Sequence, residues 1–241
     1  MNCQATVNFI EALIHTGMVP EKFVHMSSLA AIGPGNPETG EPVRLSDEPR
    51  PIELYGKSKL EAERYIMALK DFPWLIFRPT GVYGPREKDY YVFFQTINRG
   101  METYIGKAKQ ILTFIYVRDL VRVIYDALPS AVIRKSYFVT DGNEYDTELF
   151  SFIAKKHLNK KTVRLVFPPT LVKGIAYTLE KSLSLFGKMP TLNIDKYNIM
   201  CATNWRCEVE PLQHDFNFVA EYDLDKGVKE TVEWYKKEGW L

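Results

Sequence analysis

Short apolar runs alternate with longer segments of helical periodicity along the first 140 residues, and this alternation constrains the fold more than any other feature. The apolar runs are rich in β-branched and aromatic residues, as expected of buried strands. The predicted strands are residues 22–28, 74–78, 113–117 and 136–139. The predicted helices are residues 7–14, 53–71, 93–99 and 119–128. Successive parallel strands are joined by helical crossovers, so the pattern predicts an α/β fold with a parallel sheet.

The pattern changes near residue 146. From there the sequence is mostly helical, and Pro168-Pro169 opens a helix that we expect to continue through Leu185. We therefore predict two units, residues 1–145 with the sheet and residues 146–241 as a smaller lobe. Segments of the two units can interleave, so the boundary is approximate.

Composition narrows the class of protein. The 241 residues are 46% hydrophobic and carry a net charge of +1, which favours a globular core and argues against a general binder of nucleic acid. No apolar run approaches the roughly 20 residues that span a bilayer, and the first residues do not resemble a signal peptide. The three cysteines and four histidines show no metal-ligand spacing. We expect a cytoplasmic protein that acts on a small molecule and has no metal site.

The residues most suited to chemistry are Ser28, Tyr55 and Lys59. Tyr55 and Lys59 are four residues apart, so a helix places the phenol and the ammonium on one face. A neighbouring cation makes a phenol easier to ionise, which suits proton transfer near neutral pH. Ser28 ends a predicted strand. Ser27 is the competing hydroxyl, but side chains alternate along a strand and Ser27 is expected to point away.

These residues also carry a resemblance. The Ser…Tyr-x-x-x-Lys set, followed by Arg-Pro-Thr-Gly-Val-Tyr-Gly-Pro at residues 78–85, resembles the extended short-chain dehydrogenase/reductases. Within them it is most similar to the NAD-dependent epimerase/dehydratase group. The resemblance implies that Tyr55 is the general acid/base and that Lys59 holds the nicotinamide ribose and lowers the pKa of Tyr55. Ser28 would hydrogen-bond the reacting oxygen of the substrate. Residues 146–241 would form the substrate-binding lobe.

Other site residues follow from the same resemblance. The segment Pro79, Thr80, Gly81 and Val82 would contact the cofactor at the end of a strand. Many sugar-nucleotide epimerases have Asn where this chain has Gly81, which leaves room for a smaller or more apolar substrate. Arg86 and Arg118 either clamp a diphosphate or are solvated.

One feature of dinucleotide-binding domains is missing from the sequence. None of the 14 glycines forms the glycine-rich turn that places a pyrophosphate at a helix N-terminus; Gly33-Pro34-Gly35 follows a strand but lacks a third glycine. The chain therefore resembles only the later part of the family's architecture. We expect an incomplete Rossmann-like parallel sheet with an exposed apolar edge at residues 22–28. NAD is the expected cofactor and NADP the alternative, and we expect the chain alone to bind either weakly.

Three functions remain open at this point. The first is an epimerase/dehydratase that acts on a hydroxyl or ketone of a nucleotide sugar. The second is a reductase of the same superfamily that acts on a steroid- or flavonol-type hydroxyl or ketone. The third is a truncated, non-catalytic chain or a cofactor-sensing scaffold that retains the triad residues. The resemblance also implies a homodimer through the helices at residues 2–16 and 53–71.

Overall fold

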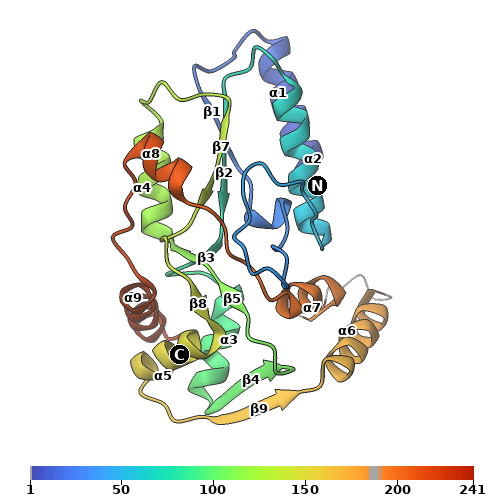
Figure 1. Ribbon diagram of the computed structural model, residues 1–241, viewed down its shortest axis with the longest axis vertical. Coiled ribbons are helices and arrows are strands. Elements are labelled where there is room, and N and C mark those ends of the chain that lie inside the picture. The colour runs from blue at the N-terminus through green and yellow to red at the C-terminus, as the bar shows by residue number, and fades with distance from the viewer. Residues whose placement is uncertain (1, 185–189, 191) are drawn as a thin grey trace.

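A parallel sheet of three strands forms the upper half of the molecule, in the order β1-β2-β7 (Figure 1). The computed structural model describes residues 2–184, 190 and 192–241. Helices cover both faces of the sheet, α1 and α2 on one and α4 and α8 on the other. This arrangement confirms the predicted α/β class. The strands are β1 (Phe23–Met26), β2 (Trp74–Pro79) and β7 (Lys135–Val139), and the helices are α1 (Asn2–His15), α2 (Leu54–Ala68), α4 (Val117–Ala127) and α8 (Glu210–Phe216).

The two faces of the sheet form separate cores, because side chains alternate along each strand. The register pairs His25 with Ile76 and Met26 with Phe77. Trp74 and Ile76 pack on Ile10, Ile66 and Phe72, between the sheet and helices α1 and α2. The opposite face packs on α4 and the segment around α8, through Leu75, Phe77, Tyr137, Val139, Leu120, Val123, Ala127, Leu212 and Phe218. Among the described strands β1 pairs only with β2, so it is an edge strand.

The lower half of the molecule contains three strand pairs and most of the remaining helices. Two of the pairs are parallel and one is antiparallel. The pairs are β3 (Gly81–Tyr83) with β6 (Phe114–Tyr116), β4 (Met101–Ile105) with β9 (Val163–Phe167), and β5 (Ile111–Leu112) with β8 (Tyr145–Asp146). The helices are η1 (Leu29–Ala31), α3 (Asp89–Asn98), α5 (Thr147–Leu158), α6 (Pro169–Ser184), α7 (Ile194–Cys201) and α9 (Leu224–Lys237), where η1 is a short 3-10 helix.

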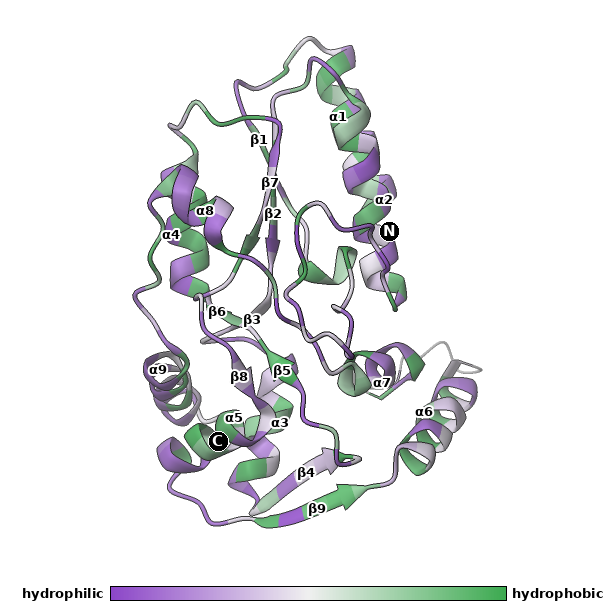
Figure 2. Ribbon diagram, in the orientation of Figure 1, coloured by the Kyte–Doolittle hydropathy of each residue, from purple (hydrophilic) through white to green (hydrophobic). Residues whose placement is uncertain are grey.

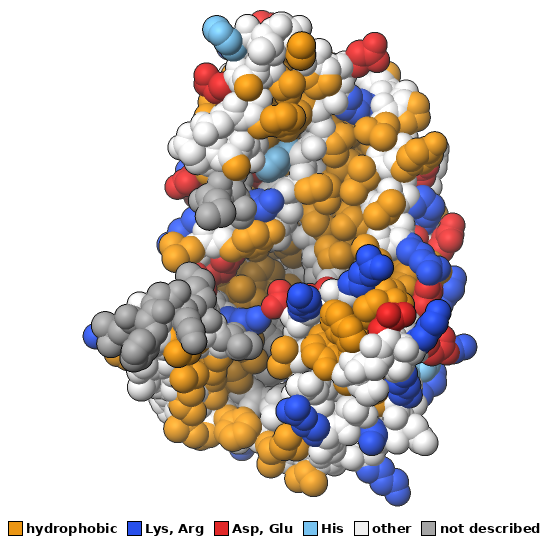
Figure 3. Space-filling model, turned by 180° about the vertical axis from the view of Figure 1, so that it is seen from behind, with side chains coloured by type: hydrophobic (Ala, Val, Ile, Leu, Met, Phe, Trp, Pro, Cys, Tyr) orange, Lys and Arg blue, Asp and Glu red, His pale blue; other side chains and the backbone are white. Residues whose placement is uncertain are grey.

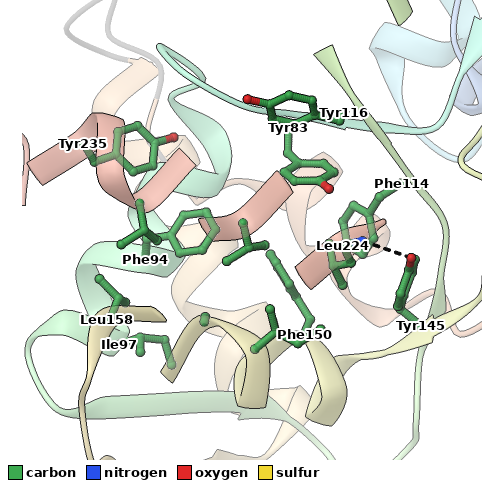
Figure 4. Packing of buried hydrophobic residues seen from close by; sticks show 14 residues of the cluster. Tyr83, Phe94, Ile97, Phe114, Tyr116, Tyr145, Phe150, Leu158, Leu224 and Tyr235 are labelled. Atoms are coloured by element: carbon green, nitrogen blue, oxygen red, sulfur yellow. Dashed lines mark hydrogen bonds between the residues drawn. The ribbon is translucent and has the colours of Figure 1, made fainter. Parts of the chain in front are cut away.

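An aromatic cluster fixes α3, α5 and α9 against the strand pairs (Figure 4). The rings of Phe93 and Phe150 stack at 4.4 Å between centroids. The Tyr145 hydroxyl accepts a hydrogen bond of 3.1 Å from the backbone N–H of Leu224, at the start of α9. Buried aromatic rings contribute large contact areas, so this cluster gives the lower half a rigid centre.

Most predicted elements exist with shifted ends. The predicted helix 53–71 is α2, with Glu53 as its N-cap, and the predicted helix 93–99 is α3, which begins four residues earlier at Asp89. The expected end of the helix at Leu185 lies outside the described residues. Strand β9 was not predicted. It pairs only with β4 among the described strands, and its apolar residues are largely exposed, so it is not a core strand.

The chain returns to its first half near the C-terminus. The backbone N–H of Gly35 donates to the Asn204 carbonyl at 2.9 Å, and that of Val43 donates to the Arg206 carbonyl at 2.9 Å. The loop at residues 33–51 is therefore held by residues 204–207.

The division of the chain into two units at residue 145 remains a prediction. No helix in the described part of the chain combines the length and the apolar character needed to cross a membrane.

Candidate active site

Ser28 lies directly after β1, where the strand turns into η1. The backbone is still extended there, with φ −161°, and the Ser28 hydroxyl accepts a hydrogen bond of 3.2 Å from the Ala30 N–H as the N-cap of η1. Ser27 points the other way: its side chain is buried, and its hydroxyl has no partner among the described residues. The alternation along the strand thus leaves Ser28 as the accessible hydroxyl.

Ser28 lines a cavity of about 180 Å³. Pro79, Thr80 and Gly81, from the end of β2 and the start of β3, line the same cavity. Thr80 is held in place by Val139, whose carbonyl accepts from the Thr80 N–H at 3.0 Å and from its hydroxyl at 3.2 Å. The carboxyl ends of neighbouring parallel strands meet here, which is where ligands gather in open α/β sheets.

The first turn of α2 packs directly on η1. The buried carboxylate of Glu53 caps the helix by accepting from the N–H groups of Tyr55 and Gly56. A Cβ atom built on Gly56 would lie 2.8 Å from the carbonyl carbon of Ala30, closer than carbon atoms pack. Because Gly56 has no side chain, the first turn of α2 can contact η1, next to Ser28.

Tyr55 and Lys59 share one face of α2, as their spacing predicts. The Lys59 Nζ lies 5.7 Å from the centroid of the Tyr55 ring. The same ammonium donates a hydrogen bond of 2.7 Å to the carbonyl of Met26, two residues before Ser28. Tyr55 is 48% exposed. Lys59 thus ties the face of α2 that carries Tyr55 to the end of β1.

The pKa of Tyr55 is shifted in the direction opposite to the expected one. Burial, followed by the Glu53 carboxylate, raises the pKa of the Tyr55 phenol above its usual value. Burial also lowers the pKa of Lys59. Burial and Glu53 set the net shift of the Tyr55 pKa, while the Lys59 ammonium is bonded to the Met26 carbonyl, so the expectation that Lys59 lowers the pKa of Tyr55 stays a prediction.

The buried charged residues next to the site form an ion pair with each other. Arg78 and Glu63 form a buried ion pair with a 2.7 Å distance between Nη2 and Oε2. The Arg78 guanidinium also lies over the Phe138 ring, 5.7 Å from its centroid. His25 is buried beside this pair, and burial, with a smaller effect of the Lys59 charge, lowers its pKa to about 4. His25 therefore stays neutral at physiological pH.

Three predicted residues lie away from the cavity. Val82 packs into the core between the sheet and α4. Arg118 forms an ion pair with Glu230 of α9 and a hydrogen bond of 3.1 Å to the Tyr222 hydroxyl. Arg86 is exposed, in a turn with φ 71°. Tyr55 and Lys59 are beside the cavity walls and do not line them.

Several residues that line the cavity were not singled out in the sequence. They include Tyr90 from α3, Phe114 from β6 and Trp205 from the segment after α7. Their positions are set by contacts between segments that are distant in sequence, and no local motif marks them. Within the described ranges no three side chains of His, Cys, Asp or Glu form a group that could hold a metal ion.

Comparisons with known proteins indicate the family of the chain. A model of the NAD dependent epimerase/dehydratase family matches residues 1–139. The chain is 28% identical to UDP-glucose 4-epimerase of Vibrio cholerae, over 92% of this chain and 68% of that protein. It is 24% identical to the 3 beta-hydroxysteroid dehydrogenase/Delta 5-->4-isomerase of Monkeypox virus, over 98% of this chain and 73% of that protein.

Two further matches concern length and fold. An uncharacterized protein of Sinorhizobium fredii is 25% identical, and the chain spans 58% of its length. Among solved structures, a UDP-glucose 4-epimerase of Thermotoga maritima with UDP-glucose aligns with a TM-score of 0.76 at 19% identity, covering 98% of this chain and 70% of that chain. This likeness shows a shared fold.

Proposed function

Because the chain belongs to the NAD dependent epimerase/dehydratase family, we propose that it is an NAD(P)-dependent oxidoreductase acting on a hydroxyl or ketone through Ser28, Tyr55 and Lys59. The observation that carries the proposal is the packing of α2 on the end of β1. Lys59 bonds the Met26 carbonyl at 2.7 Å, and Gly56 brings the first turn of α2 against η1, which Ser28 caps.

The residues present fit the nicotinamide end of the cofactor. Pro79, Thr80 and Gly81 offer a wall at the ends of parallel strands. Lys59, bonded to the Met26 carbonyl beside that wall, would supply an ammonium for a ribose hydroxyl. When bound, the nicotinamide supplies the acceptor or donor of a hydride. NAD is the proposed cofactor and NADP the alternative, and weak binding by this chain alone stays a prediction.

Tyr55 would move the proton. When a secondary alcohol is oxidised, its carbon loses a hydride and its oxygen loses a proton, which Tyr55 accepts as phenolate; the reverse step returns the proton to a ketone oxygen. The raised pKa of Tyr55 favours the protonated phenol, so the chain is set to donate a proton. Ser28 would hydrogen-bond the same substrate oxygen, and the Lys59 ammonium would stabilise the phenolate.

Two substrate classes remain. A nucleotide sugar is the first, since a relative that is 28% identical is a UDP-glucose 4-epimerase. A steroid- or flavonol-type hydroxyl or ketone is the second, and it is favoured by the cavity beside Ser28. The walls of that cavity include Leu29, Leu112, Phe114, Ile199 and Trp205.

The test is turnover of a substrate panel, followed at the absorbance of the reduced nicotinamide for net oxidation and by chromatography of the products for epimerisation or dehydration, which regenerate the cofactor. UDP-glucose, a hydroxysteroid and a flavonol would each be tried with NAD⁺ and NADP⁺. Tyr55→Phe should abolish turnover, whereas the control Tyr65→Phe should retain it, because Tyr65 is on the same helix and its hydroxyl donates to Glu11 at 2.7 Å. Turnover retained in Tyr55→Phe would remove Tyr55 from its role. Without turnover of any compound, the non-catalytic scaffold becomes the better explanation.

A further inference from the structure

A second, larger cavity adjoins the one beside Ser28. Its volume is about 460 Å³, which lies within the roughly 300–1,000 Å³ typical of small-molecule sites. It is enclosed by α3, α5 and the β4–β9 pair, with α6 and α7 on its outer side. Figure 3 shows hydrophobic side chains gathered over α6, at the lower left of that view, and Figure 2 shows apolar residues recurring along the same helix.

The lining of this cavity is mostly aromatic and aliphatic. Phe93, Phe150 and Phe167 contribute rings, and Val172 and Ile175 of α6 contribute aliphatic side chains. The polar groups among the described lining residues are the neutral side chains of Thr103, Gln110, Thr147 and Ser151 and the hydroxyls of Tyr90 and Tyr104. Such walls favour an apolar ligand with few hydrogen-bonding groups, because burial of apolar surface is favourable and a diphosphate needs charged partners to replace its hydration.

Tyr90 joins the two cavities, since its side chain lines both. Its ring lies edge-on to Phe114, at 5.6 Å between centroids, and to Phe150, at 6.0 Å. Phe114 lines the smaller cavity and Phe150 the larger. The Tyr90 backbone N–H donates to Glu87, but the Tyr90 hydroxyl forms no hydrogen bond with any described residue, so its donor and acceptor capacity is left for a ligand.

Glycine at position 81 creates the space for this hydroxyl. A Cβ atom on Gly81 would clash with the Tyr90 hydroxyl oxygen and would lie 2.9 Å from Cδ1 of Phe114. The Tyr90 hydroxyl thus occupies the place that a side chain at position 81 would fill, on the wall that Ser28 shares.

We propose that the larger cavity holds the apolar body of an alcohol or ketone whose oxygen-bearing end reaches Ser28, and that Tyr90 hydrogen-bonds this substrate where the cavities meet. The inference rests on the proposed function and specifies its substrate class. Tyr90 is then a residue that determines specificity, and Gly81 is required for its position.

The test measures binding by calorimetry, with testosterone as a flat apolar probe that carries a hydroxyl and a ketone, and UDP-glucose as the polar comparison. Testosterone should bind more tightly than UDP-glucose. Ile175→Glu, in a wall residue that is 44% exposed, should weaken testosterone binding about tenfold or more. The matched control is Leu179→Glu, one turn along α6, 37% exposed and outside the lining, which should change the affinity less than about twofold.

Three further variants separate the parts of the proposal. Tyr90→Phe should weaken testosterone binding about fivefold to tenfold, as expected for loss of one hydrogen bond. If Ile175→Glu fails to fold, Ala108→Trp serves as the alternative variant. Ala108 is an exposed residue of the lining, and an indole at this position should block the cavity. Tyr55→Phe should stop turnover while testosterone still binds, so failure of the chemistry is distinguishable from failure of binding.

Three results would overturn the proposal. They are tighter binding of UDP-glucose than of testosterone, no binding of testosterone, and equal effects of Ile175→Glu and Leu179→Glu. Unchanged affinity in Tyr90→Phe would remove Tyr90 from the specificity role.

Discussion

His25 makes the stability of the protein depend on pH, and the size of the effect follows from its burial. The residue is 7% exposed on β1, and its Nε2 has no hydrogen-bond partner among the described residues. Burial and the nearby Lys59 charge lower its pKa from 6.5 to about 4. The folded protein therefore binds a proton at His25 less readily than the unfolded chain does.

The sign follows from proton linkage. Between about pH 4 and 6.5 the unfolded chain holds more protons at this position, so the free energy of unfolding falls as the pH falls through that range. The full shift corresponds to about 3 kcal/mol, of which about 2 kcal/mol is lost by about pH 5. Asp141 acts in the opposite direction, because burial raises its pKa to about 6 and its protonation stabilises the fold over much of the same range.

A comparison with a variant isolates the His25 effect from that of Asp141. Urea unfolding of the chain and of His25→Asn would be measured at about pH 7.5 and about pH 5. The stability of the chain relative to His25→Asn should fall by about 2 kcal/mol between the two pH values. His15→Asn is the control for the substitution itself, because His15 is exposed at the end of α1.

A constant difference between the chain and His25→Asn at the two pH values would refute the reasoning. It would mean that the His25 imidazole is solvated or paired in the folded protein, and the packing of α2 over the end of β1 would have to be revised.

Three further predictions concern the elements around the site. Glu63→Gln leaves Arg78 as an uncompensated buried charge, and urea unfolding should show a loss of about 3–5 kcal/mol; a loss below about 1 kcal/mol would mean that the pair is solvated. Gly56→Ala forces α2 away from η1 and should lower the free energy of unfolding by about 1–3 kcal/mol, whereas an unchanged value would contradict the close packing. If the chain forms the expected homodimer through α1 and α2, Met67→Glu, at a position 47% exposed, should convert dimer to monomer in light scattering. Val121→Glu on α4 should leave the dimer intact, and a monomeric parent chain would exclude this interface.

The sequence alone determined the fold class and the order of the elements around the sheet. Apolar runs and helical periodicity are local properties, so β1, β2, β7 and the helices between them could be predicted from short windows. The spacing of Tyr55 and Lys59 is also local, because four residues make about one helical turn. The alternation of side chains along a strand was enough to rank Ser28 above Ser27.

Only the tertiary structure decided what surrounds these residues. Tyr90 and Trp205 line the cavity beside Ser28, but no sequence motif links their segments to Ser28. Arg118 forms an ion pair with Glu230 of the last helix. The pKa of Tyr55 depends on how deeply its phenol is buried and on the distance to Glu53, which spacing in the sequence does not reveal. Burial and charge separation are sums over contacts between distant segments, and those contacts exist only once the chain is folded.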